Sequence, residues 1–351
     1  MKPLFALCYC FIVQFSLAQS ATNIPQTVPM IDSINIAAIP NHTIQTYWLS
    51  MIEDGLSQPV AIPVLIAKGS SDHPVLGMTA ALHGNELNGI PVIQRLFDQL
   101  DINNLTGTII AIPGLNPVSI TDHRRRYVDE EDLNRNFPGK ANGNRSQQFV
   151  WQINQKILTK IDYLIDMHTA SFGRVNTLYI RADFTDETNK KMALLMDADI
   201  VLQNKGVPSA DDKMAATRTM RAEAMLKGVP TITVELGNPQ VYQEDMIQRG
   251  VRGVANIMSW LKMVPQAPQS FDPAAICKKS YWTYLDKGGY LEIPLALNQR
   301  VKKGDTMGIL RNPFGQIIKT YYCPEDGIVI GKSSNPVNMT GGRIIHLGIL
   351  E

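Results

Sequence analysis

Three separated segments of the sequence place side chains suited to a metal-dependent reaction at the ends of apolar strands. His83 and Glu86 follow an apolar run that predicts a buried strand, and they precede the apolar spacing of a helix. His168 ends a second apolar run, residues 162–167. Two imidazoles and one carboxylate are a known ligand set for catalytic zinc, which keeps a fourth position open. These residues therefore predict a site for one zinc ion.

A second carboxylate lies on another apolar strand. Glu235 belongs to the β-branched stretch 231–236, and a carboxylate in such surroundings is paired, protonated or functional. Beside zinc-bound water it could take a proton and then pass it to a leaving amine. A buried structural ion pair is the alternative. Asp166, two residues before His168, shares one side of its strand and either orients a ligand or packs within the sheet.

A long polar segment, residues 121–145, supplies cationic and amide groups, and segments of this kind are usually functional or disordered. Arg135 could hold a carboxylate through two parallel hydrogen bonds, with Asn134 beside it. Arg126 could stabilise an oxyanion at a polarised carbonyl. A solvated basic loop is the alternative for the run of arginines. Arg221, on a later predicted helix, is either a partner for a second substrate carboxylate or a solvated helix residue.

Four motifs, in this order, resemble those of the succinylglutamate desuccinylase/aspartoacylase family, whose members are relatives of the zinc carboxypeptidases. They are HGNE at 83–86, RY at 126–127 ahead of DLNRNFPG at 132–139, DMHT at 166–169 and TVELG at 233–237. The resemblance extends from about residue 43 to the end, because the C-terminal pattern also resembles the terminal barrel of that family.

The resemblance implies one zinc ion held by two histidines and a glutamate, with a second glutamate as base and proton shuttle; these are His83, Glu86, His168 and Glu235. It implies Arg126 at the carbonyl oxygen, and Asn134 with Arg135 at a substrate carboxylate. Arg125 is the alternative to Arg126, because the spacer to residue 132 is one residue longer than in aspartoacylases. Arg221 corresponds to a substrate-binding arginine only by rough position.

Strands alternate with helices over residues 41–263, which predicts an α/β domain with a mixed, mostly parallel central sheet flanked by helices, as in zinc carboxypeptidases. Ligands of such sheets bind at the carboxyl ends of strands, where the candidate residues lie. Residues 264–270 read as a linker. Short strands with glycine turns over 271–351 predict a small all-β barrel-sandwich domain, which would shape the mouth of the cleft or form a contact in a homo-oligomer.

The composition describes a soluble globular protein of 351 residues, with 44% apolar and 19% charged residues. A net charge of +1 gives no reason to expect nucleic acid or an anionic membrane as a partner. Residues 1–18 predict a signal peptide and 19–40 a flexible lead-in, so we expect an exported protein, periplasmic or secreted, without stable membrane insertion after cleavage. Cys277 and Cys323 then either pair or remain thiols.

The sequence thus predicts an exported zinc-dependent hydrolase that attacks the amide bond of an N-acyl amino acid, or a related small carboxylate, with zinc-bound water. An exported metallocarboxypeptidase for peptides, such as cell-wall peptides, is the alternative, since it would use the same zinc ligands and the same arginine. A secreted binding protein on an inactive scaffold is a third hypothesis. The complete set of ligands and base argues against it.

Overall fold

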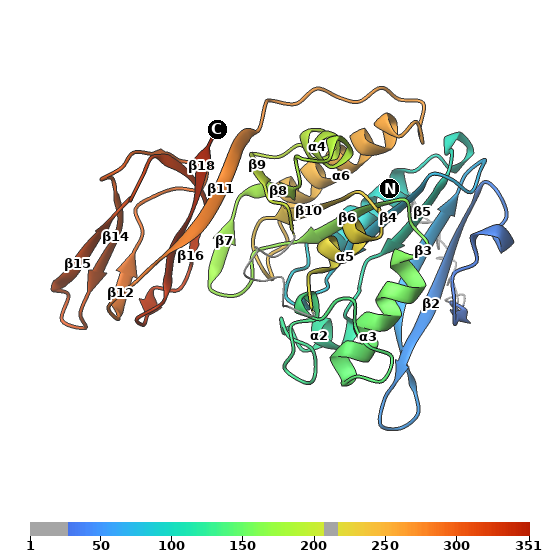
Figure 1. Ribbon diagram of the computed structural model, residues 1–351, viewed down its shortest axis with the longest axis horizontal. Helices are drawn as coiled ribbons and strands as arrows, with labels where there is room; N and C mark the ends of the chain where they lie inside the picture. Colours follow the sequence, from blue (N-terminus) through green and yellow to red (C-terminus); the bar gives the residue numbers. More distant parts are fainter. Residues whose placement is uncertain (1–26, 207–216) are drawn as a thin grey trace, which may run out of the picture.

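A large mixed sheet runs through the part of the chain that this computed structural model describes, residues 27–206 and 217–351. Its strands follow the order β1-β2-β3-β5-β4-β6-β10-β8-β9-β11-β18-β16-β13, and β7 pairs with β16 (Figure 1). A smaller sheet has the order β15-β14-β12-β17. The predicted signal peptide, residues 1–18, lies outside the described residues.

The bounds of the elements divide the chain into an α/β part and a C-terminal β part. The strands of the α/β part are β1 (Met30–Ile31), β2 (Thr43–Glu53), β3 (Pro59–Lys68), β4 (Val75–Ala80), β5 (Thr108–Ile112), β6 (Tyr163–His168), β7 (Arg174–Asn176), β8 (Leu178–Ala182), β9 (Ile200–Gln203) and β10 (Thr231–Leu236). Its helices are α1 (Gly89–Gln99), α2 (Pro117–Thr121), α3 (Arg145–Ile153), α4 (Glu187–Leu194), α5 (Met220–Leu226) and α6 (Glu244–Trp260). The C-terminal strands are β11 (Ala275–Tyr284), β12 (Gly289–Glu292), β13 (Arg300–Val301), β14 (Thr306–Arg311), β15 (Ile317–Tyr322), β16 (Gly327–Ser333), β17 (Val337–Asn338) and β18 (Arg343–Leu350).

The centre of the large sheet is parallel, so its strands deliver their carboxyl ends to one edge. Strand β4 pairs in parallel with β5 and β6, and β6 pairs in parallel with β10. Strands β2, β3 and β8 join in antiparallel fashion. β4, β5 and β10 are buried along their whole length, which explains their nearly continuous apolar sequences. The predicted mixed sheet with flanking helices is confirmed.

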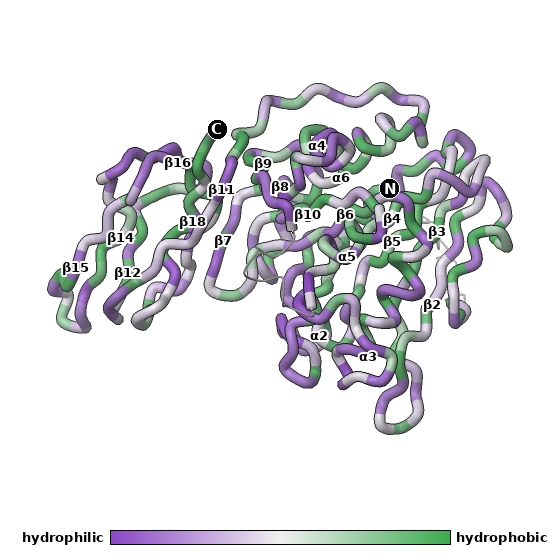
Figure 2. Tube along the Cα trace, viewed as in Figure 1, coloured by the Kyte–Doolittle hydropathy of each residue, from purple (hydrophilic) through white to green (hydrophobic). Residues whose placement is uncertain are grey.

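Helices cover both faces of this sheet, with α4 and α6 on one side and α3 and α5 on the other (Figure 1). Alternate residues of β5 enter two separate hydrophobic clusters: Ile109 packs with residues of α1 and α6, and Ile110 with residues of α3. Figure 2 shows hydrophobic residues concentrated on these inner strands. Helix α3 ends at Ile153, and the chain continues as a π-helical turn, Asn154–Leu158.

The C-terminal strands extend the large sheet. Strand β11 pairs in parallel with β9, and β16 pairs with β7, so hydrogen bonds join the two parts of the chain. The smaller sheet faces these strands across a hydrophobic cluster that includes Leu310 and Ile345. The strands expected over 271–351 are therefore present, but several of them belong to the same sheet as the α/β part. Cys277 and Cys323 are buried free thiols.

Residues 27–40 are packed against the α/β part, so the predicted flexible lead-in is wrong for this stretch. Strand β1 pairs in parallel with β2, with Met30 opposite Trp48. Ile34 and Ile39 are buried in the cluster beneath β2 and β3, which outweighs the polar and proline-rich composition around them. Among the described helices, none has the length and apolar character needed to cross a membrane.

Candidate active site

The turn between β4 and α1 fixes His83 and Glu86 next to each other. The backbone N–H of Glu86 donates to the carbonyl of His83 at 3.1 Å, which closes the turn. Gly84 lies directly on the backbone of Ser119, where a Cβ atom would come within 2.0 Å of the carbonyl carbon. This close approach explains why the motif has glycine between its two titratable residues.

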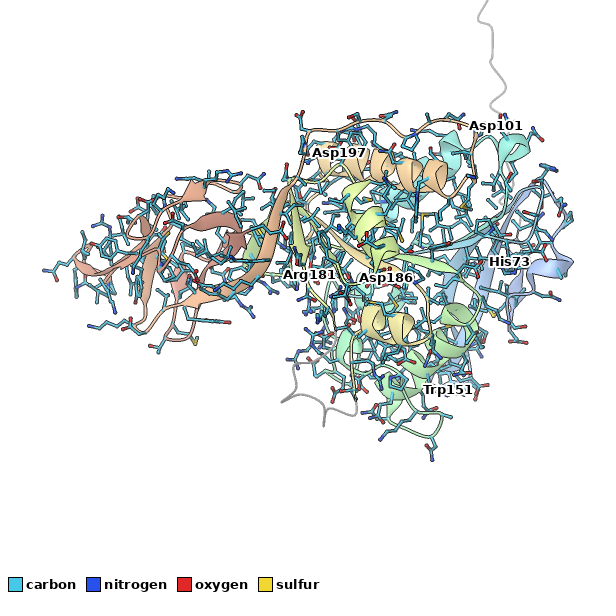
Figure 3. All side chains as sticks on the ribbon, turned by 45° about the horizontal axis from the view of Figure 1, so that its top comes forward. His73, Asp101, Trp151, Arg181, Asp186 and Asp197 are labelled. Atoms are coloured by element: carbon cyan, nitrogen blue, oxygen red, sulfur yellow. The ribbon has the colours of Figure 1, made fainter. Side chains whose placement is uncertain are left out.

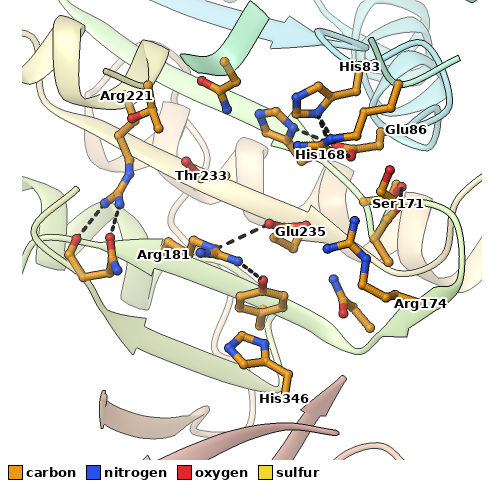
Figure 4. Close-up of a pocket in the computed structure, with 18 of the residues that line it drawn as sticks. His83, Glu86, His168, Ser171, Arg174, Arg181, Arg221, Thr233, Glu235 and His346 are labelled. Atoms are coloured by element: carbon orange, nitrogen blue, oxygen red, sulfur yellow. Dashed lines mark hydrogen bonds and ion pairs between the residues drawn. The ribbon is translucent and has the colours of Figure 1, made fainter. Parts of the chain in front are cut away.

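Two neighbouring strands bring His168 and Glu235 to the same edge. His168 is the last residue of β6, and Glu235 lies opposite it in the parallel pair of β6 and β10. Glu235 is 9% exposed, and its Oε1 lies 3.4 Å from Nε of Arg181 on the adjacent strand β8. Glu235 therefore lies on the strand next to that of His168. Among the described ion pairs, its carboxylate contacts one arginine, Arg181 (Figure 4).

The three predicted metal ligands converge on one point. Glu86 Oε2 lies 2.9 Å from Nδ1 of His83 and 2.8 Å from Nδ1 of His168 (Figure 4). One ligand atom from each residue lies within 4.8 Å of the others, and all three side chains are buried. The residues predicted from three separate segments are thus brought together by the fold.

The opposite nitrogen of each ring shows which atoms face this point. Nε2 of His83 lies 3.0 Å from Asp132, and Nε2 of His168 lies 2.8 Å from Asp166. A metal ion bound at Nδ1 of each ring would leave the proton on Nε2, where the carboxylate behind it accepts a hydrogen bond. Arg125 Nη1 lies 3.3 Å from Nδ1 of His83. The Nδ1 atoms of two imidazoles and a carboxylate oxygen therefore meet, and this donor set fits a divalent metal ion.

The charges around the centre stabilise positive charge on these side chains. Burial tends to lower the pKa of His168, but Asp166 and Glu86 outweigh burial and hold that pKa well above its usual value. Burial tends to raise the pKa of Glu86, but His83 and His168 hold it well below its usual value. Positive charge among these side chains is thus strongly stabilised, whether a proton or a metal ion supplies it.

Of the two neighbouring arginines, Arg125 lies in the site and Arg126 does not. The guanidinium of Arg125 donates to Glu86 Oε1 at 2.5 Å and to Asp132 Oδ2 at 3.0 Å. Arg126 is exposed and donates to the backbone carbonyl of Glu130 at 2.7 Å. The expected position of Arg126 is therefore corrected, because the longer spacer to Asp132 brings Arg125 alongside that carboxylate instead.

The expected substrate-binding residues line the same pocket, and each has at least one hydrogen bond within the protein. Asn134 Oδ1 accepts from the backbone N–H of Met220 at 2.8 Å, and Arg135 donates to the carbonyl of Asn134 at 2.8 Å. Arg221 donates to the backbone carbonyl of Asn204 at 2.7 Å and also to its side-chain oxygen. Burial, followed by repulsion from another arginine, lowers the pKa of Arg221 to about 10.

Other residues of the pocket were not predicted from the sequence; they include Arg174 and Asn176 on β7, Tyr179 and Arg181 on β8, Trp282 on β11 and His346 on β18. Trp282 stacks on His346 with ring centroids 5.1 Å apart. Burial, then Arg181, lowers the pKa of His346 to about 3, so this ring is neutral at physiological pH. Figure 3 shows Arg181 where the two parts of the chain meet. No linear spacing indicated these residues, because pairing between distant strands places them here.

Fold and site together define an α/β protein with a His–Glu–His centre at the carboxyl edge of its sheet. The succinylglutamate desuccinylase/aspartoacylase catalytic domain family matches residues 72–261, more than half of the chain. The chain therefore belongs to this family, and the resemblance seen in its motifs is confirmed. Known relatives are deacylases, so the chain is a hydrolase.

Individual relatives agree with this assignment. The N-alpha-acetyl-L-2,4-diaminobutyric acid deacetylase of Halomonas elongata is 24% identical over 265 residues, which cover 71% of this chain and 73% of the relative. The product-bound ectoine utilization protein EutE (DoeB) of Ruegeria pomeroyi has a similar structure, with a TM-score of 0.78, 19% identity and coverage of 89% of this chain and 97% of that one. A succinylglutamate desuccinylase/aspartoacylase of Rhodobacter sphaeroides has a TM-score of 0.77 and 19% identity, and the match covers 90% of this chain and 98% of that one. The shared fold thus includes most of the C-terminal strands.

Proposed function

We propose that this hydrolase is an exported, zinc-dependent deacylase that cleaves the amide bond of an N-acyl amino acid or a related small carboxylate. The observation that supports it most is the convergence of two imidazole nitrogens and a carboxylate oxygen beside Glu235. Export rests on residues 1–18, outside the described residues, and stays a prediction.

Zinc is the metal that the donor set fits best, since two imidazoles and one carboxylate in a buried site are typical of catalytic zinc. His83, Glu86 and His168 would hold it, and Asp132 and Asp166 orient the two rings from behind. When bound, zinc polarises a substrate carbonyl and lowers the pKa of a water molecule.

Glu235 is placed to move the proton of the reaction. Its carboxylate lines the pocket beside His168 and takes a proton from the water that attacks the carbonyl carbon. As the carbon–nitrogen bond breaks, Glu235 returns this proton to the leaving nitrogen, so the products are a carboxylate and a free amine. Arg181, at 3.4 Å, orients the carboxylate and balances its charge.

The charge of the pocket favours an anionic substrate. Five guanidinium groups line it, against the carboxylates of Glu86 and Glu235; they belong to Arg125, Arg135, Arg174, Arg181 and Arg221. Trp282 and His346 close one wall, which supports a small substrate over a long peptide. We therefore expect acylated amino acids with additional carboxylates to bind better than those with a cationic side chain.

A panel of substrates tests this proposal. The zinc-loaded protein should hydrolyse N-acetyl-L-aspartate or N-succinyl-L-glutamate with a kcat/KM about 100-fold above that for Nα-acetyl-L-2,4-diaminobutyrate, because like charges in a binding site cost several kcal/mol. Release of free amine measures the rate. Faster cleavage of peptides at their carboxyl end would support the metallocarboxypeptidase instead. Failure to cleave any compound would contradict the proposal and favour a binding protein.

The arginine pair gives a second prediction. Arg125→Gln should lower kcat by about 100-fold, because it removes a cation that contacts Glu86 and can stabilise the oxyanion at the carbonyl. Arg126→Gln should change kcat by less than about twofold, because that side chain is exposed and bonds only a backbone carbonyl among its described contacts. Steady-state kinetics with zinc content measured in parallel provides the test. Equal losses in both variants would show that the position of Arg125 has no catalytic meaning.

A further inference from the structure

Arg174 differs from the other pocket arginines in having no polar partner for its side chain among the described residues. Arg125 bonds Glu86 and Asp132, and Arg181 donates to Tyr179 at 2.5 Å. Arg135 and Arg221 also have bonded partners, as described above. Nε of Arg174 is buried without a hydrogen bond, as is Nε of Arg181, but the Nη2 atom of Arg181 has Tyr179 as a partner. A half-buried guanidinium in this state has fewer acceptors than it would have in water, so a ligand oxygen would stabilise it.

The surroundings of Arg174 increase its need for an anion. Burial, followed by repulsion from Arg343 and Arg125, lowers its pKa, while Glu86 and Glu235 offset only part of this effect. Figure 4 shows the Arg174 side chain pointing toward Glu235, with Arg221 at the opposite end of the pocket. Arg174 thus lies near the reacting groups and apart from Arg221.

A buried acceptor lies next to this cation. Asn176 is two residues from Arg174 on β7, so both side chains emerge on the same side of the strand, and both line the pocket. Asn176 is 6% exposed, and its Oδ1 has no hydrogen-bond donor among the described residues. The side chain is held against Gly331 of β16, where an added Cβ would lie 2.3 Å from that oxygen. The site therefore offers a cation and an acceptor that both lack partners.

We propose that Arg174 and Asn176 form the subsite for the amino-acid half of the substrate. Arg174 binds the α-carboxylate, and Asn176 Oδ1 accepts the N–H of the scissile amide. In an N-acyl amino acid these two groups are separated by a single carbon, so one ligand satisfies both. The same nitrogen must face Glu235, which returns the proton to it, and Arg174 points toward Glu235. This subsite rests on the deacylase function proposed above.

The pairing of β7 with β16 fixes the geometry of the subsite. Val175 lies opposite Lys332, and Asn176 opposite Gly331, so the backbone of β7 is held in the large sheet by a strand of the C-terminal part. Since β7 has only three residues, this pairing is what orients its side chains. The C-terminal strands thus position residues for specificity as well as closing the pocket.

Kinetics with a matched pair of substrates tests the subsite. N-acetyl-L-aspartate and its α-carboxamide have the same scissile bond and differ only in the charge at the α position. The wild type should prefer the acid by about 10- to 100-fold, the range expected for a hydrogen bond to a charged group. In Arg174→Gln this preference should disappear through a rise in KM for the acid, with little change for the amide. Arg174→Lys should restore part of it, and Arg300→Gln, an exposed arginine of β13, should behave as wild type.

Calorimetry can measure how the zinc-loaded protein binds the same two compounds. This measurement separates the subsite from the proposed function. If the wild type binds the acid in an Arg174-dependent way but cleaves nothing, the subsite stands and the deacylase function is wrong. If the wild type cleaves both compounds and Arg174→Gln keeps the preference for the acid, the subsite is wrong and the function stands. An equal loss of kcat on both compounds would instead assign Arg174 to the oxyanion, which also contradicts the subsite.

Discussion

Replacement of Glu235 by glutamine is expected to lower kcat by about 1000-fold, the middle of the range for loss of a general base. Glutamine keeps the size of the side chain and its place on β10, opposite His168. It cannot accept the proton of the attacking water or return it to the amine. KM should change by less than about threefold, because the carboxylate acts on the reacting atoms and contributes little to ground-state binding.

The control for this variant is Glu292→Gln, the same change at an exposed position of β12. Zinc content and thermal unfolding should match the wild type in both proteins. If Glu235→Gln retained activity within tenfold of the wild type, Glu235 would be a structural partner of Arg181 and another group would move the proton.

Removal of the metal should abolish hydrolysis, and one equivalent of zinc should restore it. The effect should exceed that of any single substitution, at about 10⁴-fold or more, because the metal polarises the carbonyl and activates the water together. His168→Gln should purify with less than one zinc per chain. His73→Gln, which changes an exposed histidine paired with Asp162, should keep a full equivalent. Figure 3 shows His73 well away from Arg181, at the far side of the α/β part.

Metal analysis of the same proteins gives a result that does not depend on activity. Asp166→Asn leaves His168 in place but weakens the acceptor for its Nε2, so we expect zinc affinity to fall by 10- to 100-fold, about the effect of losing such an orienting carboxylate. Unchanged activity after chelation, or full zinc occupancy in His168→Gln, would refute the metal mechanism.

The centre could be predicted from the sequence because local patterns specify it. His83, Glu86, His168 and Glu235 each follow or end an apolar run, and the carboxyl ends of parallel strands meet at one edge. A strand pattern and the nearest turn are sufficient to place such residues. The sequence motifs around these residues indicate the family without any knowledge of how the strands pair.

Other residues could not be placed in this way, since their positions depend on the path of the chain between elements. The choice between Arg125 and Arg126 is decided by the loop that leads to Asp132. Arg174 and Asn176 enter the pocket because β7 pairs with a strand about 150 residues further on. Such pairings depend on packing between whole layers, and a three-residue strand has no periodicity that predicts them.

Distant pairing also decides how the N-terminal residues and the C-terminal β part join the rest of the fold. Ile34 and Ile39 are isolated apolar residues in a polar, proline-containing stretch, yet both are buried against the sheet. The composition changes near residue 271, but the hydrogen bonds from β9 to β11 cross that boundary. The change in composition near residue 271 thus marks where the helices stop and the all-β part begins, but the large sheet continues across it.

The pairing of β9 with β11 also covers an edge of the catalytic sheet. Strand β9 has the sequence IVLQ and is largely buried, and β11 occupies its free edge. Without the C-terminal strands, its unpaired N–H and C=O groups and apolar side chains would form an exposed edge, the kind of surface that templates strand addition between molecules. The C-terminal β part therefore covers the β9 edge of the catalytic sheet, in addition to completing the pocket.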